Sequence, residues 1–241
     1  MRPVTNRADL GIDLYADGAQ IDEILAAYRS GLADGFTTNP TLMVKAGVRD
    51  YREFARAILA EIPDLPVSFE VISDEFEEMG RQAREIASWG ANVFVKVPIS
   101  NTRGESSLPL IRELCADGVQ VNATAVMTLE QVAGVIDAVR DDVPAIVSIF
   151  AGRIADTGVD PVPIMREAVS MASRRPLLKV LWASPREVLN LYQAAACGCH
   201  SIAVTPDLLA KLSLRGKDLT EFSRETVQMF YDDASRAGYR L

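Results

Sequence analysis

Short apolar segments recur along the chain, and each is followed by a longer segment whose apolar residues return at helical spacing. Several of the short segments are continuous rather than alternating, which is typical of strands covered on both faces. The eight predicted strands span residues 11–16, 35–38, 67–72, 93–98, 119–125, 145–150, 177–183 and 201–205. The predicted helices between them span residues 21–30, 51–62, 75–89, 107–116, 129–140, 162–173 and 186–196.

Two positions carry signals for the start of a helix. Thr128 with Gln131 has capping-box spacing, and so does Ser184 with Glu187, where Pro185 would take the first helical position. We therefore predict that helices begin directly after Thr128 and directly after Ser184.

The regular alternation of strands and helices, without a linker, predicts an α/β protein with a single (β/α)8 TIM barrel over residues 1–241. A doubly wound open sheet is the alternative. No Gly-x-Gly-x-x-Gly sequence follows the first predicted strand, which removes the usual reason to prefer that sheet.

The two ends of the chain fall outside the alternation. Residues 1–10 have no apolar core behind their arginines, so we expect a short lead-in rather than a signal peptide. Beyond the eighth strand, residues 207–213 and 219–237 have helical patterns, although a barrel needs only one helix there. We predict a C-terminal helical extension at residues 214–241, which could cover the base of the barrel or pack on a neighbouring subunit.

The composition limits the classes of molecule that the protein is expected to bind. A net charge of -8 and a pI of about 4.8 argue against binding to nucleic acid or to anionic membranes, because both require a basic surface. A phosphorylated substrate needs only one or two local arginines and stays compatible with this charge. No apolar segment approaches the length of a membrane span, and the odd cysteine count suggests reduced thiols, so we expect a cytoplasmic protein.

One cluster raises the question of a metal. Cys197, Cys199 and the single histidine, His200, lie together just before the last predicted strand. The two cysteines are too close for the usual metal-binding pair, and small apolar thiols in an Ala/Cys/Gly run normally pack. We predict no metal site here.

Lys96 interrupts the apolar strand Asn-Val-Phe-Val-Lys-Val-Pro at residues 92–98. Lysines are almost never fully buried unless they are paired or used. In an apolar pocket the amine loses its proton more easily and becomes a nucleophile that forms Schiff bases with carbonyl groups. The alternative is a lysine at a strand end that reaches for solvent or for a carboxylate.

In a (β/α)8 barrel the active site lies at the carboxyl ends of the strands. Polar residues occur at these ends in nearly every predicted strand, and together they offer acids, an amine, amides, hydroxyls and guanidinium groups. They are Asp13, Asp17, Thr37, Thr38, Asn39, Glu70, Lys96, Asn122, Thr124, Ser148, Arg153, Ser184 and Arg186.

From residue 13 to the C-terminus the sequence resembles the transaldolase family, in particular its short-chain branch, which also contains fructose 6-phosphate aldolases. The resemblance is carried by residues 14–17 (Leu-Tyr-Ala-Asp), 37–40 (Thr-Thr-Asn-Pro), Glu70, 95–98 (Val-Lys-Val-Pro), 122–124 (Asn-Ala-Thr) and 148–156 (Ser-Ile-Phe-Ala-Gly-Arg-Ile-Ala-Asp).

The resemblance implies that Lys96 forms a Schiff base with a ketose phosphate. The iminium accepts the electrons of the breaking carbon–carbon bond, so no metal or organic cofactor is expected. Asp17 is implied to be the base on the substrate hydroxyl, although before Gly18 it could also be a turn residue. Glu70 and Thr124 are implied to hold a water for the proton transfers, and an ion pair between Glu70 and Lys96 is compatible with that role.

A second group is implied to contact the substrate, namely Thr38, Asn39, Asn122, Ser148 and Phe150. Asn39 and Asn122 would hold hydroxyls of the donor, and Ser148 would contact the dihydroxyacetone moiety. Each has a simpler alternative: Asn39 could form the turn before a proline, Asn122 could be satisfied by backbone, and Ser148 could be a small buried hydroxyl.

The phosphate group would be bound by Arg153, Ser184 and Arg186. An ion pair with Asp156 is the alternative for Arg153. The family usually carries Ser-Phe-Arg or Ser-Phe-Lys after the seventh strand, and the segment that begins at Trp182 is about three residues shorter. We expect Ser184 to cap a helix whose amides point at the site, while Arg186 either replaces the missing basic residue or faces solvent.

Two positions bear on the reaction. The aldolase branch typically has glutamine where this chain has Glu70 and tyrosine where it has Phe150, so both positions match transaldolases. A tyrosine hydroxyl helps to protonate and release the three-carbon unit, whereas phenylalanine cannot. We therefore predict transfer of a dihydroxyacetone unit from fructose 6-phosphate or sedoheptulose 7-phosphate to an aldose phosphate acceptor.

Three alternatives remain at this point. The first is cleavage that releases dihydroxyacetone, as in fructose 6-phosphate aldolase. The second is a lysine-based aldolase of another kind, such as one acting on deoxyribose phosphate, which would not require Thr-Thr-Asn-Pro. The third is a catalytically silent sugar-phosphate-binding barrel. The resemblance also suggests a ring-like homo-oligomer, a pentamer or decamer.

Overall fold

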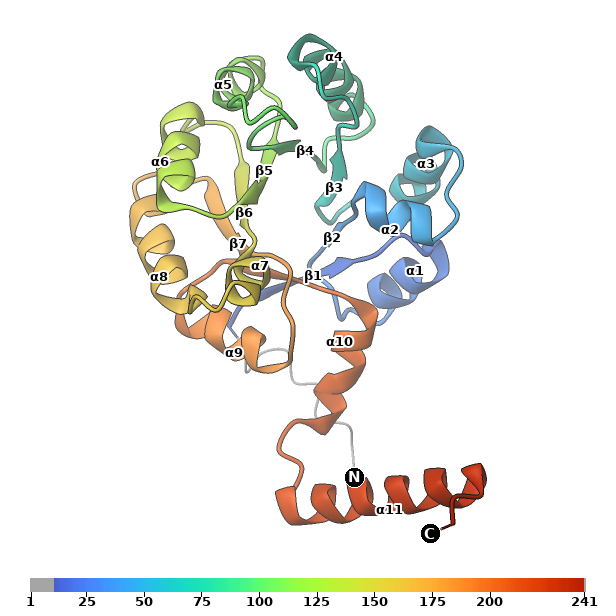
Figure 1. Cartoon of the computed structure of the whole chain (residues 1–241). Helices are drawn as coiled ribbons and strands as arrows, with labels where there is room; N and C mark the ends of the chain where they lie inside the picture. The colour runs from blue at the N-terminus through green and yellow to red at the C-terminus, as the bar shows by residue number, and fades with distance from the viewer. Residues whose placement is uncertain (1–10, 241) are drawn as a thin grey trace.

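Eight parallel strands close into a barrel in the computed structural model, which describes residues 11–240 (Figure 1). Each strand pairs with the next in sequence, and β8 returns to β1, which confirms the predicted (β/α)8 barrel. The predicted lead-in at residues 1–10 lies outside the described residues. The strands are β1 (Asp13–Asp17), β2 (Gly35–Thr37), β3 (Val67–Glu70), β4 (Val93–Pro98), β5 (Val121–Val126), β6 (Ala145–Ile149), β7 (Leu178–Trp182) and β8 (Ser201–Val204).

Helices surround the strands and cover their outer face (Figure 1). The helical elements of the described residues are α1 (Ile21–Arg29), α2 (Pro40–Lys45), α3 (Tyr51–Glu61), α4 (Phe76–Ala87), α5 (Leu108–Ala116), α6 (Leu129–Ala138), α7 (Ala151–Asp156), α8 (Pro161–Ala172), α9 (Leu189–Ala196), α10 (Pro206–Ala210), the 3-10 helix η2 (Lys211–Leu214) and α11 (Leu219–Ala237), of which α11 does not cover the strands.

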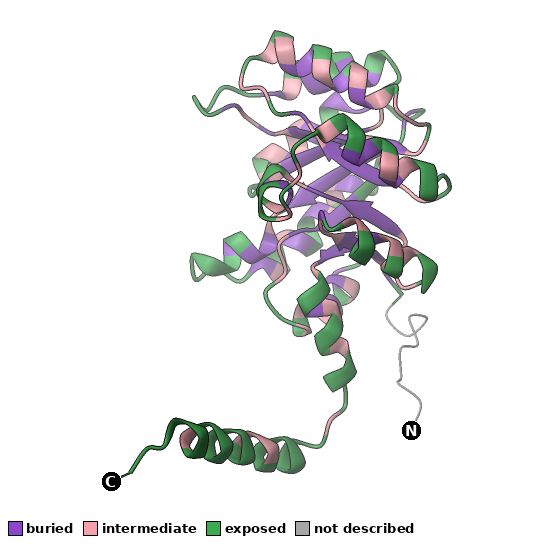
Figure 2. Cartoon of the chain, turned by 90° about the vertical axis from the view of Figure 1, so that its right-hand side faces the viewer, coloured by how far each residue is buried: buried purple, intermediate pink, exposed green. Residues whose placement is uncertain are grey.

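The core has two layers because side chains of a strand alternate between its faces. Tyr15, Ile146, Leu181 and Ala203 pack inside the barrel. The larger layer lies between the strands and the helices, and the strands are almost wholly buried in Figure 2. Burial on both faces explains the continuous apolar runs of the sequence.

The structure differs from the sequence prediction in two additional short helices and in the start of one predicted helix. The short helices α2 and α7 were not predicted, since each follows a strand too closely to show a helical period. Thr128 and Gln131 form the predicted capping box at the start of α6. The predicted capping box at Ser184 is wrong: Ser184 has a positive φ of 61°, and the next helix begins only at Leu189.

The last helix, α11, stands apart from the barrel in Figures 1 and 2 and has no buried residue. The single chain therefore does not use it to cover the base of the barrel. No helix within residues 11–240 combines the length and the apolarity needed to cross a bilayer.

Candidate active site

A cavity of about 460 Å³ lies at the carboxyl ends of the strands. Its lining includes most of the residues predicted for the site, which are Asp17, Asn39, Glu70, Lys96, Thr124, Ser148, Phe150, Arg153, Ser184 and Arg186. Thr38 and Asn122 are buried and lie outside this lining. A larger hollow of about 800 Å³ lies at the other end of β4–β6, and the lining that residues 11–240 contribute to it contains no lysine, histidine or cysteine.

Lys96 is held inside the barrel, with 6% of its surface exposed. Its Nζ donates to the Thr38 carbonyl at 2.8 Å and lies 3.2 Å from Glu70 Oε2. The pair is adjacent because Glu70 and Lys96 are opposite each other in the β3–β4 register. The alternative of a lysine that reaches solvent is therefore wrong, whereas the predicted ion pair with Glu70 is present.

Asp17 ends β1 and faces the same cavity. Its Oδ1 is buried and has no hydrogen-bond partner within residues 11–240. Burial raises the pKa of Asp17 to about 6, while the charge of Lys96 opposes this shift and that of Glu70 adds to it. A carboxylate that gains its proton near pH 6 is suited to act as a general base close to neutral pH.

Thr124 reaches the cavity from an irregular part of β5. Its Oγ1 is buried without a partner among the described residues. The register with β6 shifts between Ala123 and Val126, and Ala125 has a positive φ of 59°. Bulges of this kind redirect side chains next to active sites, so the irregularity provides a way to turn the Thr124 hydroxyl into the cavity.

A buried hydrogen-bonded chain supports the floor of the site. Ser148 Oγ donates to Asn122 Oδ1 at 2.7 Å, and Asn122 Nδ2 donates to Ser68 Oγ at 3.1 Å. The partners of Asn122 are thus side chains rather than the backbone. Ser148 lines the cavity, and Asn122 lies behind it and fixes its hydroxyl.

Asn39 and Thr38 lie where the chain leaves β2. Asn39 caps α2 with its Oδ1, which accepts from the Leu42 N–H at 3.0 Å, so its amide nitrogen remains for a ligand. Thr38 contributes its carbonyl to Lys96, while its Oγ1 is buried without a partner in the described part of the chain.

At the end of the cavity near α7, Arg153 has no ion pair with any residue of the described range 11–240, so the alternative of a pairing with Asp156 is not found. Asp156 instead pairs with Arg186, whose Nε lies 3.1 Å from Asp156 Oδ1. Asp156 therefore holds Arg186 at the cavity, while 48% of the Arg186 side chain is exposed to solvent. Ser184 lines the cavity but does not cap a helix, because the next helix begins only at Leu189. Trp182 is fully buried and is not part of the described cavity lining.

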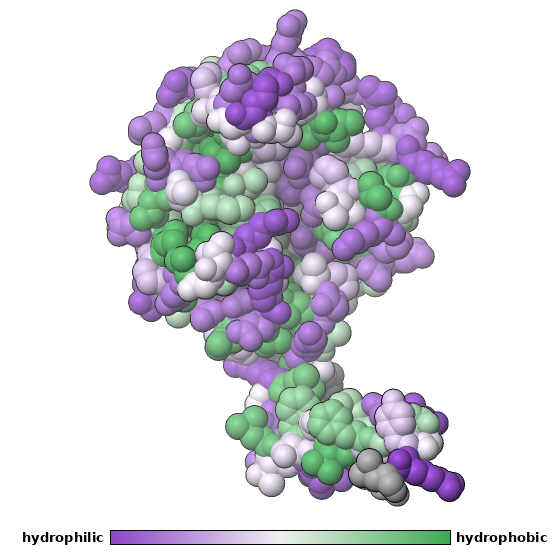
Figure 3. Space-filling view, in the orientation of Figure 1, coloured by the Kyte–Doolittle hydropathy of each residue, from purple (hydrophilic) through white to green (hydrophobic). Residues whose placement is uncertain are grey.

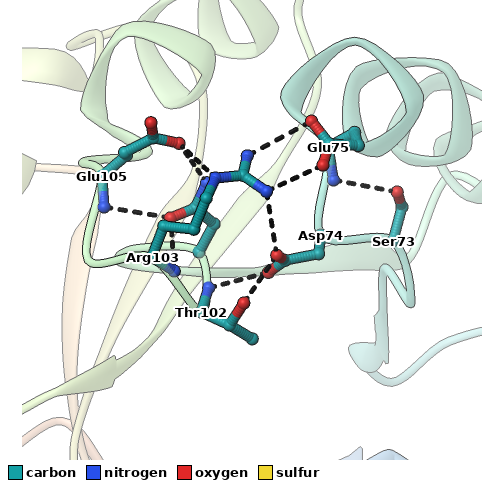
Figure 4. A network of polar contacts seen from close by, with 7 residues as sticks. Ser73, Asp74, Glu75, Thr102, Arg103 and Glu105 are labelled. Atoms are coloured by element: carbon teal, nitrogen blue, oxygen red, sulfur yellow. Dashed lines mark hydrogen bonds and ion pairs between the residues drawn. The ribbon is translucent and has the colours of Figure 1, made fainter.

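A polar network joins the loops that follow β3 and β4 (Figure 4). Arg103 Nη1 lies 2.8 Å from Glu75 and 3.4 Å from Asp74. Thr102 donates its N–H and its hydroxyl to Asp74, each at 2.7 Å, and these bonds hold the pKa of Asp74 below its usual range. The network ties together the loops next to the two strands that carry the lysine and its carboxylate partner.

Several residues of the site were not predicted. The sequence marks Thr37 only as a polar residue at a strand end. Thr41, Ala125 and Thr205 also line the cavity, and no sequence pattern assigns them to the site. Tyr51 contacts the backbone of Glu70 from α3 and lies in a segment whose pattern indicated only an amphipathic helix.

The metal question concerns a different part of the barrel. Cys197 Sγ donates to the Val162 carbonyl at 3.6 Å, and His200 Nδ1 accepts from the Val180 N–H at 3.0 Å. Within residues 11–240 no group of three or more His, Cys, Asp or Glu residues is placed to hold a metal ion.

Comparison with known proteins decides the family. The family model described as "Transaldolase/Fructose-6-phosphate aldolase" matches residues 14–241. This chain belongs to that family. It is an enzyme family of aldolase-type chemistry, and the match includes every residue of the cavity lining.

Relatives within the family cover most of the chain. A "Probable transaldolase" of Dehalococcoides mccartyi is 36% identical over 80% of this chain and 86% of its own length. A "Probable transaldolase" of Thermoanaerobacter sp. is 32% identical over 94% of this chain and 99% of its own length. A "Probable transaldolase 2" of Listeria monocytogenes is 34% identical over 82% and 87%, respectively.

More distant solved structures share the barrel alone. KGPDC from Streptococcus mutans has a TM-score of 0.53 at 12% identity and covers 80% of this chain and 88% of its own. Dihydrodipicolinate synthase from Rhodopseudomonas palustris has a TM-score of 0.50 at 14% identity, and the match covers 93% of this chain and 80% of that protein.

Proposed function

We propose that the protein is a transaldolase that transfers a dihydroxyacetone unit from fructose 6-phosphate or sedoheptulose 7-phosphate to an aldose phosphate. The observation that carries the proposal is the buried Lys96 amine, 3.2 Å from the Glu70 carboxylate, in a cavity also lined by the partly desolvated Asp17. An amine nucleophile and two carboxylates supply the groups that Schiff-base aldol chemistry needs.

The first half of the reaction forms the iminium. Lys96 Nζ, after passing a proton to the adjacent Glu70, adds to the ketone carbon of the donor. Loss of the carbinolamine hydroxyl as water requires proton delivery, for which Glu70 and the unpartnered Thr124 hydroxyl can hold a water molecule. Proton transfers by positioned groups contribute about 10²–10⁴-fold to a rate.

The second half breaks and remakes a carbon–carbon bond. Asp17 accepts the proton of the C4 hydroxyl, the bond between C3 and C4 breaks, and its electrons move into the iminium to give an enamine on Lys96. An aldose phosphate leaves. The enamine then attacks the aldehyde of the acceptor, Asp17 returns its proton to the new hydroxyl, and hydrolysis of the iminium frees the product.

Arg153, Ser184 and Arg186 are proposed to bind the phosphate group. Guanidinium groups match phosphate oxygens in geometry and charge. Arg153 has no ion pair in the described part of the chain, and Asp156 holds Arg186 against the same end of the cavity.

Phe150 favours transfer over release. It lines the cavity and has no hydroxyl that could deliver a proton to the enamine. The test is to supply fructose 6-phosphate with and without an aldose phosphate acceptor. We expect product only with acceptor, whereas release of free dihydroxyacetone at a comparable rate without acceptor would assign the protein to the aldolase branch instead.

A panel of aldose phosphates would then identify the acceptor. We also propose that the chain works as a homo-oligomer through α11, whose exposed apolar residues lie off the barrel (Figure 3). Phe222, Val227, Phe230 and Tyr231 are among them.

A further inference from the structure

On the side facing β2, a tyrosine hydroxyl holds the backbone of Glu70. The Tyr51 hydroxyl donates to the Glu70 carbonyl at 2.8 Å and accepts from the Glu70 N–H at 2.7 Å. Tyr51 is the first residue of α3, whose start is fixed by the Asp50 side-chain cap. One side chain thus satisfies both backbone polar groups of the residue that ends β3.

The geometry of β2 explains why a hydroxyl is required there. β2 ends at Thr37, and the last ladder bond runs from the Thr38 N–H to the Ser68 carbonyl at 3.3 Å. In a regular parallel ladder the next bond would run from the Glu70 N–H to the Thr38 carbonyl. Here that carbonyl instead accepts from Lys96 Nζ at 2.8 Å. The Tyr51 hydroxyl therefore takes the place of the Thr38 carbonyl as the acceptor for the Glu70 N–H. This leaves the Thr38 carbonyl available to Lys96.

The ring of Tyr51 is fixed by two other aromatic side chains. It packs edge-on against Phe69, with centroids 6.2 Å apart, and against Trp89 at 5.8 Å. Phe69 and Trp89 also contact each other at 5.7 Å. Burial raises the pKa of Tyr51, so the hydroxyl keeps its proton at neutral pH and remains both donor and acceptor.

We propose that Tyr51 is a positioning residue for the Lys96–Glu70 pair; this inference rests on the proposed function of that pair in iminium formation. Without the hydroxyl, the Glu70 N–H either stays unpaired or takes the Thr38 carbonyl from Lys96. Either result moves the carboxylate relative to Nζ, so the proton transfers slow down. Tyr51 is outside the described lining of the cavity, so we expect the groups proposed to bind the sugar phosphate to keep their places.

The experiment uses Tyr51→Phe, which removes the hydroxyl and retains the ring. Borohydride is added at successive times after mixing with saturating fructose 6-phosphate, and the adduct on Lys96 is quantified by mass. We expect the rate of adduct formation to fall at least tenfold in Tyr51→Phe. The final extent of labelling and the KM for the donor stay within twofold of the wild type.

Two controls separate positioning from stability. Tyr28→Phe removes a hydroxyl that donates to Asp64 at 2.8 Å on the surface, and it should trap at the wild-type rate. Val135→Ala opens a gap in the buried face of α6 and should lower Tm without slowing the trapping. All proteins are compared at a temperature at which each is folded.

The outcomes are distinguishable. A wild-type trapping rate in Tyr51→Phe, beside an active wild-type protein, would overturn this inference and leave the proposed function intact. A rate that falls equally in Val135→Ala would also overturn it, because the loss would then follow stability. Absence of the adduct in the wild type would overturn the proposed function and this inference with it.

Discussion

At the scale of single residues, the most consequential environment is that of Asp17. The carboxylate must ionise to act as a base, yet its burial opposes ionisation. Because the pKa rises from 3.8 to about 6, the ionised form costs on the order of 3 kcal/mol of folding free energy. The residue is thus expected to weaken the fold in the state in which it catalyses.

Asp17→Asn tests this trade-off. The raised pKa means that the folded state favours the protonated acid, so the wild type loses stability relative to the variant as pH rises from about 4 to about 6. We expect the variant to be more stable by about 3 kcal/mol at pH 8, equal near pH 3, and about 10²–10⁴-fold less active. Denaturant unfolding at the two pH values measures the difference.

Asp13→Asn is the matched control on the same strand. Asp13 pairs with Lys179 at 3.1 Å, and its side chain is 41% exposed, so its removal should change stability by about 1 kcal/mol or less. Equal stability of Asp17→Asn and the wild type at pH 8 would contradict the account of Asp17. For the wild type, we also expect kcat/KM to fall as pH drops below about 6.

At the scale of elements, a close contact of α7 shapes the proposed phosphate end of the cavity. A Cβ added at Gly152 would lie 1.6 Å from the Ser184 carbonyl oxygen and 3.2 Å from Arg186 Nε. The segment after β7 can lie against α7 only because residue 152 has no side chain.

Gly152→Ala should therefore push this segment away from the cavity. We expect the KM for a phosphorylated donor to rise at least tenfold, with a smaller change for the non-phosphorylated sugar, which does not use these residues. Gly80→Ala in α4 is the control, since its added Cβ would meet only the ends of the Arg84 and Leu110 side chains at 3.1 and 3.2 Å. An unchanged KM in Gly152→Ala would remove Ser184 and Arg186 from the phosphate site.

The barrel could be predicted from the sequence because burial on both faces leaves continuous apolar strands at regular intervals. The segment after β7 could not. Ser184, Pro185 and Glu187 have the composition of a helix start, but the close contact with Gly152 and the positive φ of Ser184 delay the helix to Leu189. Tertiary contact overrode a correct local signal.

The site shows the same division. Lys96 and Glu70 can be predicted from the sequence because a charged residue is unusual in an otherwise apolar strand. Tyr51 cannot be, because an aromatic residue at the start of an amphipathic helix looks like core packing. Its role depends on where β2 leaves the sheet, which no local pattern reveals.

At the scale of the whole molecule, α11 is the part that the single chain leaves unexplained. Its exposed apolar residues include Phe230, which is 62% exposed, and they form a largely apolar surface in Figure 3. Apolar patches of this kind usually mark interaction surfaces. Together with the proposed homo-oligomer, this favours a role of α11 in subunit contacts.

Removal of residues 219–241 should therefore lower the molar mass measured by light scattering from that of the proposed homo-oligomer to that of a smaller species. Phe230→Asp should weaken the assembly in the same direction, whereas Ser235→Asp on the same helix should not. An unchanged mass after truncation would show that another surface holds the subunits together.

Covalent attachment of the donor to Lys96 is the step on which the whole proposed reaction depends. The direct measurement is borohydride reduction of the wild-type protein with fructose 6-phosphate in the absence of acceptor, followed by peptide mass analysis. We expect a hydrogenated three-carbon adduct on Lys96 and no adduct in Lys96→Ala. An unlabelled Lys96, or full turnover by Lys96→Ala, would contradict it.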